Sequence, residues 1–207
     1  MRVVLVGQAA FGQSVLKGLL AAGHEIAAVY ALPESKGKKD PLAVEAEQAG
    51  LTVRTPASYK TPEVAAEVAA LGADLGVLAF VTKIIPPAVF EAPRLGTLCF
   101  HPSLLPKYRG LHTHRQVLEA GDRVHGASVH FVTRELDGGP VVIQARVPVR
   151  DDDDEATLAA RVLEQEHRIY PEAVDWFATG RLRFQDGAAW LDGRRLDAPV
   201  QMAPADG

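Results

Sequence analysis

The residue with the clearest chemical potential is His101, which lies inside the segment Leu-Cys-Phe-His-Pro-Ser-Leu-Leu-Pro-Lys-Tyr-Arg-Gly at positions 98–110. It follows an apolar run typical of a buried strand, and Pro102 comes directly after it. Because proline has no backbone N–H, we expect the strand to end here, with His101 at its carboxyl end. Ligands bind at that edge in open α/β sheets. Taken alone, however, the pattern favours a rigid turn that contains a hydrogen-bonded histidine.

A second candidate is Asp137, in the segment Glu-Leu-Asp-Gly-Gly-Pro at positions 135–140. The segment joins two apolar runs, and the two glycines after Asp137 predict close backbone approach and unusual dihedral angles. On its own, Asp137 is an ordinary turn aspartate.

Regular alternation of strand and helix patterns in the first half indicates how such residues are positioned. Continuous β-branched runs are typical of parallel strands buried on both faces. The alternation predicts an α/β fold, with a Rossmann-like, doubly wound, mostly parallel sheet. The expected strands are 2–6, 26–30, 51–54, 75–80 and one reaching 100, and the expected helices are 13–22, 41–49, 62–71 and a short turn at 86–92.

The second half has a different pattern. It predicts a helix, then two strands joined by the loop that carries Asp137, then a long helix that begins after four aspartates and ends near Ala178. A small C-terminal hairpin is expected around Asp186-Gly187. The expected elements are 112–120, 127–133, 141–149, 155–178, 181–184 and 188–191. We expect a single domain over 1–207, with an N-terminal half at 1–106 and a C-terminal half at 107–207.

Bulk composition is ordinary for a soluble globular protein, with 207 residues, 47% apolar and 23% charged. The net charge of -4 offers no global attraction to nucleic acid or to an anionic membrane. The single cysteine excludes an internal disulfide and suits a reducing compartment. No apolar stretch is long enough to span a bilayer. We therefore expect a cytoplasmic protein, while the oligomeric state is not readable.

The loop from Gly7 to Gly12 does not support a nucleotide cofactor. It is neither a Gly-x-Gly-x-x-Gly fingerprint nor a Walker A loop. A plain strand-to-helix turn that needs small residues is the better interpretation. The N-terminus of the following helix could still hold an anionic part of a substrate.

Four histidines suggest zinc, but their spacing matches no standard ligand set. Cys99 is alone, and His112 and His114 do not form an i, i+4 pair. We expect no metal, with most of these histidines on the surface or behind the reacting groups. The aspartates at 151–154 favour a solvated helix start over a cation site.

Together, the His-Pro-Ser-Leu-Leu-Pro-Lys-Tyr and Glu-Leu-Asp-Gly-Gly-Pro segments resemble the signature of the formyltransferases that use 10-formyltetrahydrofolate. The resemblance implies the formyltransferase fold and transfer of a formyl group to an amine, with 10-formyltetrahydrofolate as co-substrate. It implies that His101 donates to the oxyanion of the tetrahedral species, best as imidazolium, and that Asp137 supports that charge. With both motifs present, the catalytic interpretation of both residues is preferred.

Cys99 departs from the family pattern. The family's transferases usually carry an asparagine two residues before the histidine, and its amide helps to hold the oxyanion. A thiol is a weak donor and cannot replace that amide. Cys99 is therefore the third expected catalytic position, and we expect it to impair the activity. We do not expect Cys99 to act as a nucleophile, because an apolar strand raises the pKa of a thiol.

The resemblance also assigns binding residues. Folate contacts are expected from the backbone around the pterin, and Lys83, which stands where related enzymes carry an arginine, could face the glutamate tail or lie in solvent. The folate positions are Phe80, Val81, Thr82, Lys83, Ile84, Leu98, Arg134, Glu135 and Leu136, and the acceptor positions are Gln8, Pro102 and Glu166.

The two halves resemble different branches of the family. Residues 1–106 are similar to the hydrolase domain of 10-formyltetrahydrofolate dehydrogenase and to methionyl-tRNA formyltransferase, whereas residues 107–207 are similar to glycinamide ribonucleotide (GAR) transformylase. The chain is thus a chimera or a divergent natural homologue. GAR is the leading acceptor. The alternatives are hydrolysis of 10-formyltetrahydrofolate and a catalytically weak folate-binding scaffold.

Overall fold

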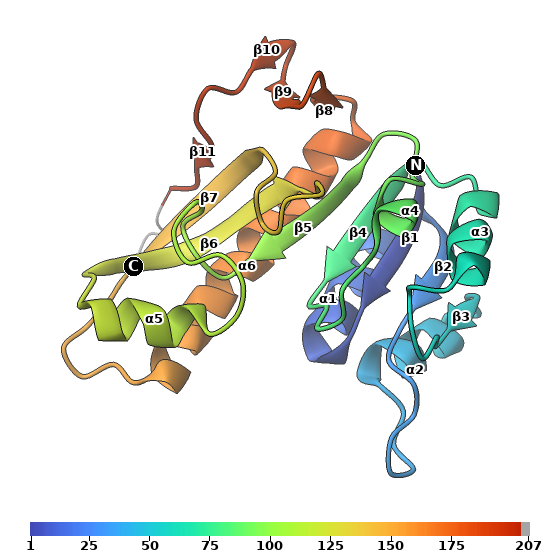
Figure 1. Ribbon diagram of the computed structural model, residues 1–207, viewed down its shortest axis with the longest axis horizontal. Helices are drawn as coiled ribbons and strands as arrows, with labels where there is room; N and C mark the ends of the chain where they lie inside the picture. The colour runs from blue at the N-terminus through green and yellow to red at the C-terminus, as the bar shows by residue number, and fades with distance from the viewer. Residues whose placement is uncertain (204–207) are drawn as a thin grey trace. The chain divides into compact units, whose positions relative to one another are not determined.

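The computed structural model describes residues 1–203 (Figure 1). By its internal contacts the chain divides into two compact units, Met1–Cys99 and Phe100–Gly207. The boundary falls a few residues before the expected division into halves at 106/107. It lies inside a strand whose last residue is His101.

The first unit is built on a parallel sheet with the strand order β3-β2-β1-β4-β5. The interiors of β1 and β4 are fully buried, as their β-branched and apolar runs predict. This arrangement confirms the expected α/β class. The strands are β1 (Arg2–Gly7), β2 (Glu25–Tyr30), β3 (Val53–Arg54), β4 (Leu75–Ala79) and β5 (Thr97–His101).

Four helices connect these strands: α1 (Ala9–Ala21), α2 (Pro41–Gln48), α3 (Pro62–Ala70) and α4 (Pro87–Phe90). The chain winds outward from β1 to β3 and then returns to β4, so the direction of winding reverses. Because such crossovers are right-handed, α1 and α2 cover one face and α3 and α4 the other. In agreement, α1 packs on α2 and α3 packs on α4. The reversal makes a topological switch point between β1 and β4, where α/β sheets bind ligands.

The start of α1 differs from the expectation, because the helix begins at Ala9 and not at Gln13. The carboxylate of Asp40 accepts the backbone N–H of Ala9 at 2.9 Å and 3.1 Å, and thereby satisfies a free donor at the start of the helix. The same carboxylate accepts the N–H of Leu42 at 2.9 Å and caps α2. A contact that joins positions 9 and 40 leaves no local sequence signal.

The second unit contains an antiparallel pair, β6 (Val124–Phe131) and β7 (Val141–Pro148), with β11 (Val200–Gln201) parallel to β7. The expected C-terminal hairpin is present as β8 (Leu182–Gln185) and β9 (Ala188–Leu191), and β10 (Arg194–Arg195) extends it. Strands β10 and β11 were not predicted, because two residues carry no readable periodicity.

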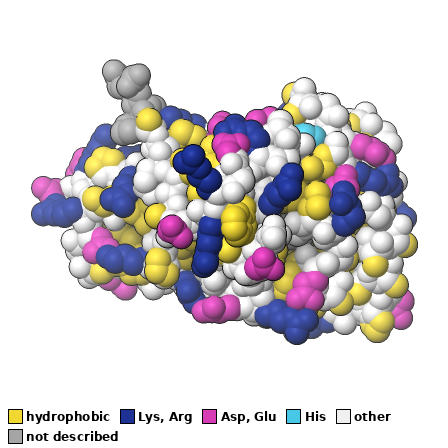
Figure 2. Space-filling view, turned by 90° about the horizontal axis from the view of Figure 1, so that it is seen from above, with side chains coloured by type: hydrophobic (Ala, Val, Ile, Leu, Met, Phe, Trp, Pro, Cys, Tyr) yellow, Lys and Arg dark blue, Asp and Glu magenta, His cyan; other side chains and the backbone are white. Residues whose placement is uncertain are grey.

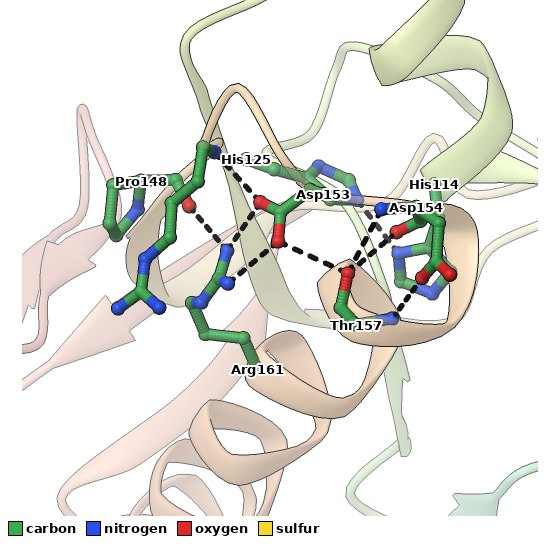
Figure 3. A network of polar contacts seen from close by, with 8 residues as sticks. His114, His125, Pro148, Asp153, Asp154, Thr157 and Arg161 are labelled. Carbon is green, nitrogen blue, oxygen red and sulfur yellow. Dashed lines mark hydrogen bonds and ion pairs between the residues drawn. The ribbon is translucent and has the colours of Figure 1, made fainter.

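Two helices complete this unit, α5 (Thr113–Ala120) and α6 (Glu155–Ala178). Helix α6 packs against β6 and β7 and buries one apolar face. A capping box between Asp154 and Thr157 starts the helix, and Arg161 holds Asp153 through two hydrogen bonds of 2.7 Å (Figure 3). The acidic run therefore starts the helix, as predicted.

Among residues 1–203, no helix has the length and apolar character that crossing a membrane requires.

Candidate active site

His101 is the last residue of β5 and is buried, as the proline after it predicts. Its Nε2 lies 2.8 Å from the carbonyl oxygen of Tyr108. Because a carbonyl only accepts hydrogen bonds, Nε2 must carry the hydrogen. The other ring nitrogen, Nδ1, lies 3.5 Å from Oδ2 of Asp137. The structure thus brings the two motif residues together within the second unit, and Nδ1 is the nitrogen that protonation would turn into a new donor.

Asp137 lies in the loop between β6 and β7 with a φ of 47°, which confirms the unusual dihedral angle expected for it. Its Oδ2 accepts the backbone N–H of Gly110 at 2.8 Å, which orients the carboxylate. The loop requires Gly139, because a Cβ there would lie 1.8 Å from the carbonyl oxygen of Phe131. The glycines therefore allow the close backbone approach that the sequence predicted.

His130, in β6, lies at the site; the sequence had presented it only as one of four histidines that could bind a metal, lie on the surface or stand behind the reacting groups. Its Nδ1 lies 2.9 Å from the carbonyl oxygen of Phe131, and its Nε2 lies 3.7 Å from Oδ1 of Asp137. Burial lowers the pKa of the His130 imidazole. The available signal was its position at the end of a strand whose hairpin loop carries Asp137.

Buried polar side chains hold the segment that follows His101. Ser128 in β6 donates to the carbonyl oxygen of Ser103 at 2.6 Å and accepts the N–H of Leu105 at 3.1 Å. Gln144 in β7 donates to the carbonyl oxygen of Leu105 at 2.9 Å. Satisfied networks of this kind rigidify their surroundings. The loop that contacts His101 and Asp137 is therefore anchored on two strands of the same unit.

Glu166 lies in the middle of α6 and is 4% exposed. Its carboxyl group has no hydrogen-bond or ion-pair partner within residues 1–203, and burial raises its pKa to about 8. A buried carboxyl group without a partner is costly unless a ligand completes it. Perturbed groups of this kind are concentrated at functional sites.

His114 and His125 form a second buried histidine contact, with Nδ1 of one 3.1 Å from Nε2 of the other (Figure 3). Burial lowers the pKa of His125 to about 4, so this ring is neutral near pH 7. Within the described part of the chain, no group of three or more histidine, cysteine, aspartate or glutamate residues is placed to hold a metal ion.

The switch point of the first unit brings together two other expected site residues. Thr82 follows β4 and donates its hydroxyl hydrogen to Oε1 of Gln8, which follows β1, at 3.1 Å. Phe80 adopts a φ of 58°, a strained value for an aromatic residue, and is 48% exposed. Ile84 is 74% exposed. Strained backbone and exposed apolar side chains at a switch point are features of a ligand site.

In this unit the contacts of Lys83 and Asp40 bear on two expectations, that Lys83 could face the folate's glutamate tail and that the N-terminus of α1 could hold an anion. The Nζ of Lys83 donates to the carbonyl oxygens of Pro56 at 3.3 Å and Ala57 at 3.0 Å, so its charge is engaged in a loop contact. The N-terminus of α1 was expected to be able to hold an anionic part of a substrate. The Asp40 carboxylate bonded to Ala9 already places an anion there.

The remaining candidate residues are placed as follows. Leu98 is fully buried, so only its backbone is available to a ligand, and Cys99 is half-buried beside Leu78 of β4. Glu135 pairs with Arg109, and Leu136 is 72% exposed. Val81 and Pro102 are partly exposed, and Arg134 is exposed.

A buried histidine beside a carboxylate, at the strand ends of an α/β fold, is an arrangement that can exchange protons with a bound substrate. Comparison with known proteins gives the family. The family model described as formyl transferase matches residues 1–174. The chain belongs to the formyl transferase family.

Curated relatives come from three branches. Phosphoribosylglycinamide formyltransferase of Escherichia coli is 57% identical over 133 residues, covering 64% of this chain and 62% of that protein. Methionyl-tRNA formyltransferase of Ruegeria pomeroyi is 43% identical over 180 residues, which cover 84% of this chain and 60% of that protein. Human cytosolic 10-formyltetrahydrofolate dehydrogenase is 34% identical over 212 residues, which cover 100% of this chain and 22% of that protein. The chain thus spans about three fifths of the first two relatives.

Among solved structures, phosphoribosylglycinamide formyltransferase of Coxiella burnetii superimposes with a TM-score of 0.82 at 31% identity. The match covers 98% of this chain and 99% of that one. The expected formyltransferase fold is therefore confirmed over nearly the whole chain.

Proposed function

We propose that this protein transfers the formyl group of 10-formyltetrahydrofolate to the amine of glycinamide ribonucleotide, a step of purine biosynthesis. The observation that carries the proposal is the 3.5 Å approach of His101 to Asp137, which unites the two motifs. The similarity to the Escherichia coli enzyme supports the acceptor.

The reaction requires three things of these residues. When the amine attacks the formyl carbon, negative charge develops on the formyl oxygen, and a donor must meet it. We assign that donor to the Nδ1–H of protonated His101, since Nε2–H is already donated to Tyr108. Asp137 stabilises the imidazolium and accepts the proton that the amine loses. As the C–N10 bond breaks, N10 of the folate regains a proton.

Glu166 is the residue we assign to the acceptor amine. A buried carboxyl group without a partner gains a hydrogen bond when an amine arrives, so binding removes the cost of leaving it unpaired. Because burial raises its pKa to about 8, Glu166 is mostly protonated near neutral pH and can donate a hydrogen bond to the free amine. Gln8 and Pro102 are further proposed acceptor contacts.

The chain offers matching surfaces for the folate. Phe80 and Ile84 in the first unit, and Leu136 in the second, are large apolar side chains left exposed. Flat heteroaromatic rings such as a pterin bind to apolar surfaces of this kind. We propose that these residues, with the backbone of 81–83, 98 and 134–135, contact the folate. The chemistry of the co-substrate therefore fits the residues present.

Hydrolysis of 10-formyltetrahydrofolate is the second candidate function, favoured by two specific observations. Cys99 replaces the usual asparagine donor, and Asp40 places an anion at the N-terminus of α1. A carboxylate at that position opposes a substrate phosphate. Water carries no phosphate, so the carboxylate of Asp40 does not disfavour it as acceptor.

We also propose that the protein acts in the cytoplasm on small molecules and not on nucleic acid. The net charge of -4 and the single cysteine support this. Basic and acidic side chains are interspersed over the face drawn in Figure 2, so neither sign dominates there.

The test is turnover of a stable 10-formyl folate analogue with and without glycinamide ribonucleotide. The proposal predicts turnover that requires the acceptor. Equal turnover without it would establish the hydrolase instead. Saturable folate binding with no turnover would leave only a folate-binding scaffold and would contradict both activities.

A further inference from the structure

Three side chains of the small C-terminal sheet form a row on one of its faces. Trp190 in β9 lies opposite Arg183 of β8 and opposite Arg195 of β10. Residues directly opposite each other in an antiparallel sheet project from the same face. Phe184 projects from the other face, where it stacks on Phe131 of β6 with ring centroids 5.0 Å apart. The face with the two arginines and the tryptophan is therefore the one turned away from β6.

Two tight turns hold this row in place. Each is an Asp-Gly pair with positive φ at both residues, 52° and 72° at 186–187 and 51° and 76° at 192–193. Such turns match the twist of the strands that they join. Strands β8, β9 and β10 consequently lie side by side (Figure 1). Because neighbouring strands lie about 4.8 Å apart, the backbones at Arg183 and Arg195 are separated by roughly 10 Å, with Trp190 between them.

A cleft of about 460 Å³ opens where the hairpin meets the end of α6, and Trp190 and Arg183 line it. This volume lies within the range of small-molecule sites. Two other charged residues of the cleft neutralise each other, because Arg181 donates two hydrogen bonds of 2.8 Å to the carboxylate of Asp192. The charge that the cleft offers to a ligand is therefore that of Arg183.

The guanidinium groups of the row are available to an anion. Nε of Arg183 donates to the carbonyl oxygen of Gly180 at 3.3 Å, and neither Arg183 nor Arg195 forms an ion pair within residues 1–203. The indole N–H of Trp190 donates to the carbonyl oxygen of Gln185 at 3.2 Å, which fixes the ring and leaves its face for stacking. This short segment carries four arginines in a chain whose net charge is -4.

We propose that this face binds a nucleoside monophosphate, at a site that shares no residue with the candidate active site. The base stacks on the indole of Trp190, as bases do on exposed aromatic side chains. The phosphate accepts paired hydrogen bonds from Arg183 in the cleft, and Arg195 adds positive charge at the other edge of the ring. One ring beside one cleft matches a single nucleotide, whereas a long polyanion would meet the acidic remainder of the chain.

Nitrogen-15 NMR of the indole groups tests the stacking directly, because the chain has only two tryptophans. Trp190→Leu identifies the resonance of Trp190, and the buried Trp176 is the internal control. AMP should move the Trp190 resonance and leave that of Trp176 in place. Adenosine and inorganic phosphate at the same concentration should move it much less. An unmoved Trp190 resonance with AMP, or an equal shift with adenosine, would overturn the proposal.

Calorimetric titration with AMP tests the phosphate contact. We expect Arg183→Gln to weaken the Kd on the order of 10- to 100-fold, as for lost hydrogen bonds to a charged group. Arg194→Gln is the matched control, since this arginine lies opposite Leu191 and projects from the other face of β10. It should keep the wild-type Kd.

Two results of this titration would overturn the proposal: a wild-type Kd in Arg183→Gln, or an equal loss in Arg194→Gln. An oligoadenylate that binds far more tightly than AMP would identify a nucleic-acid surface instead and would overturn it as well. Because the site does not depend on the reaction, AMP binding with no turnover of formyl folate would sustain this proposal while the proposed function fails.

Discussion

Among the candidate side chains, the carboxyl group of Glu166 is the one whose burial costs the most free energy of folding, and it also has a proposed role. A carboxyl group whose pKa rises on folding to about 8, from an ordinary value of 4.5, binds protons more tightly in the folded state. Below about pH 4.5 the group is protonated in both states, so its burial does not lower the free energy of unfolding through ionisation. The penalty grows by about 1.4 kcal/mol per pH unit up to about pH 8 and is constant above it.

We predict that Glu166→Gln is more stable than the wild type by about 3–5 kcal/mol at pH 8 and by little at pH 4.5. The same variant should raise KM for the acceptor amine. Urea unfolding of both proteins across this pH range measures the difference. Glu164→Gln, on the exposed face of the same helix, is the control and should show no such trend. A stability difference independent of pH would contradict the assignment.

Cys99 is the second single residue on which the rate of formyl transfer is expected to depend. It lies two residues before His101 in β5, so the two side chains project from the same face of the strand. We predict that Cys99→Asn raises acceptor-dependent kcat on the order of 10²–10³-fold, the usual value of one oxyanion donor. Cys99→Val, which has no donor, should not raise it. No gain from asparagine would mean that the missing donor is supplied elsewhere.

At the scale of elements, two helix starts use aspartate in different ways. Asp154 caps α6 within its own helix, whereas Asp40 caps α2 and also bonds to the first residue of α1. Either carboxylate contributes about 1 kcal/mol of stability through its cap. Only Asp40 adds negative charge at a switch point where a substrate phosphate would approach.

We predict that Asp40→Asn lowers KM for glycinamide ribonucleotide on the order of fivefold, for a removed repulsion of about 1 kcal/mol. Asp154→Asn should lose similar stability and leave that KM unchanged. Steady-state kinetics, with inorganic phosphate as competitor, checks both variants. Equal KM values in the two variants would show that the phosphate does not approach α1.

Local sequence chemistry predicted the backbone around His101 and Asp137, whereas their catalytic role was implied only by the resemblance to the family. Proline after His101 indicated the strand end, and glycines after Asp137 indicated its left-handed backbone. Both signals act within a few residues. The contacts that sequence reasoning missed, Asp40 with Ala9 and His130 with Asp137, depend on how distant elements pack. For the same reason, the apolar periodicity of α6 predicts that position 166 is buried, but it does not predict that the carboxyl group of Glu166 lacks a partner.

At the scale of the whole molecule, the chain is similar to members of three branches of the formyl transferase family. It is 57% identical to the Escherichia coli formyltransferase over 133 residues, and it aligns over its full length with the human dehydrogenase. The boundary between the two compact units falls inside β5, close to the expected junction of the two halves. We propose that the resemblance of the two halves to different branches bears on which acceptor the site uses.

The most direct test of the central claim follows the formyl carbon itself. A carbon-13 formyl folate analogue is incubated with the protein and glycinamide ribonucleotide, and the products are identified by NMR. We predict that the label appears on the amine, that little appears as formate, and that His101→Asn abolishes the transfer. Label found only as formate, at a rate that glycinamide ribonucleotide does not change, would contradict formyl transfer.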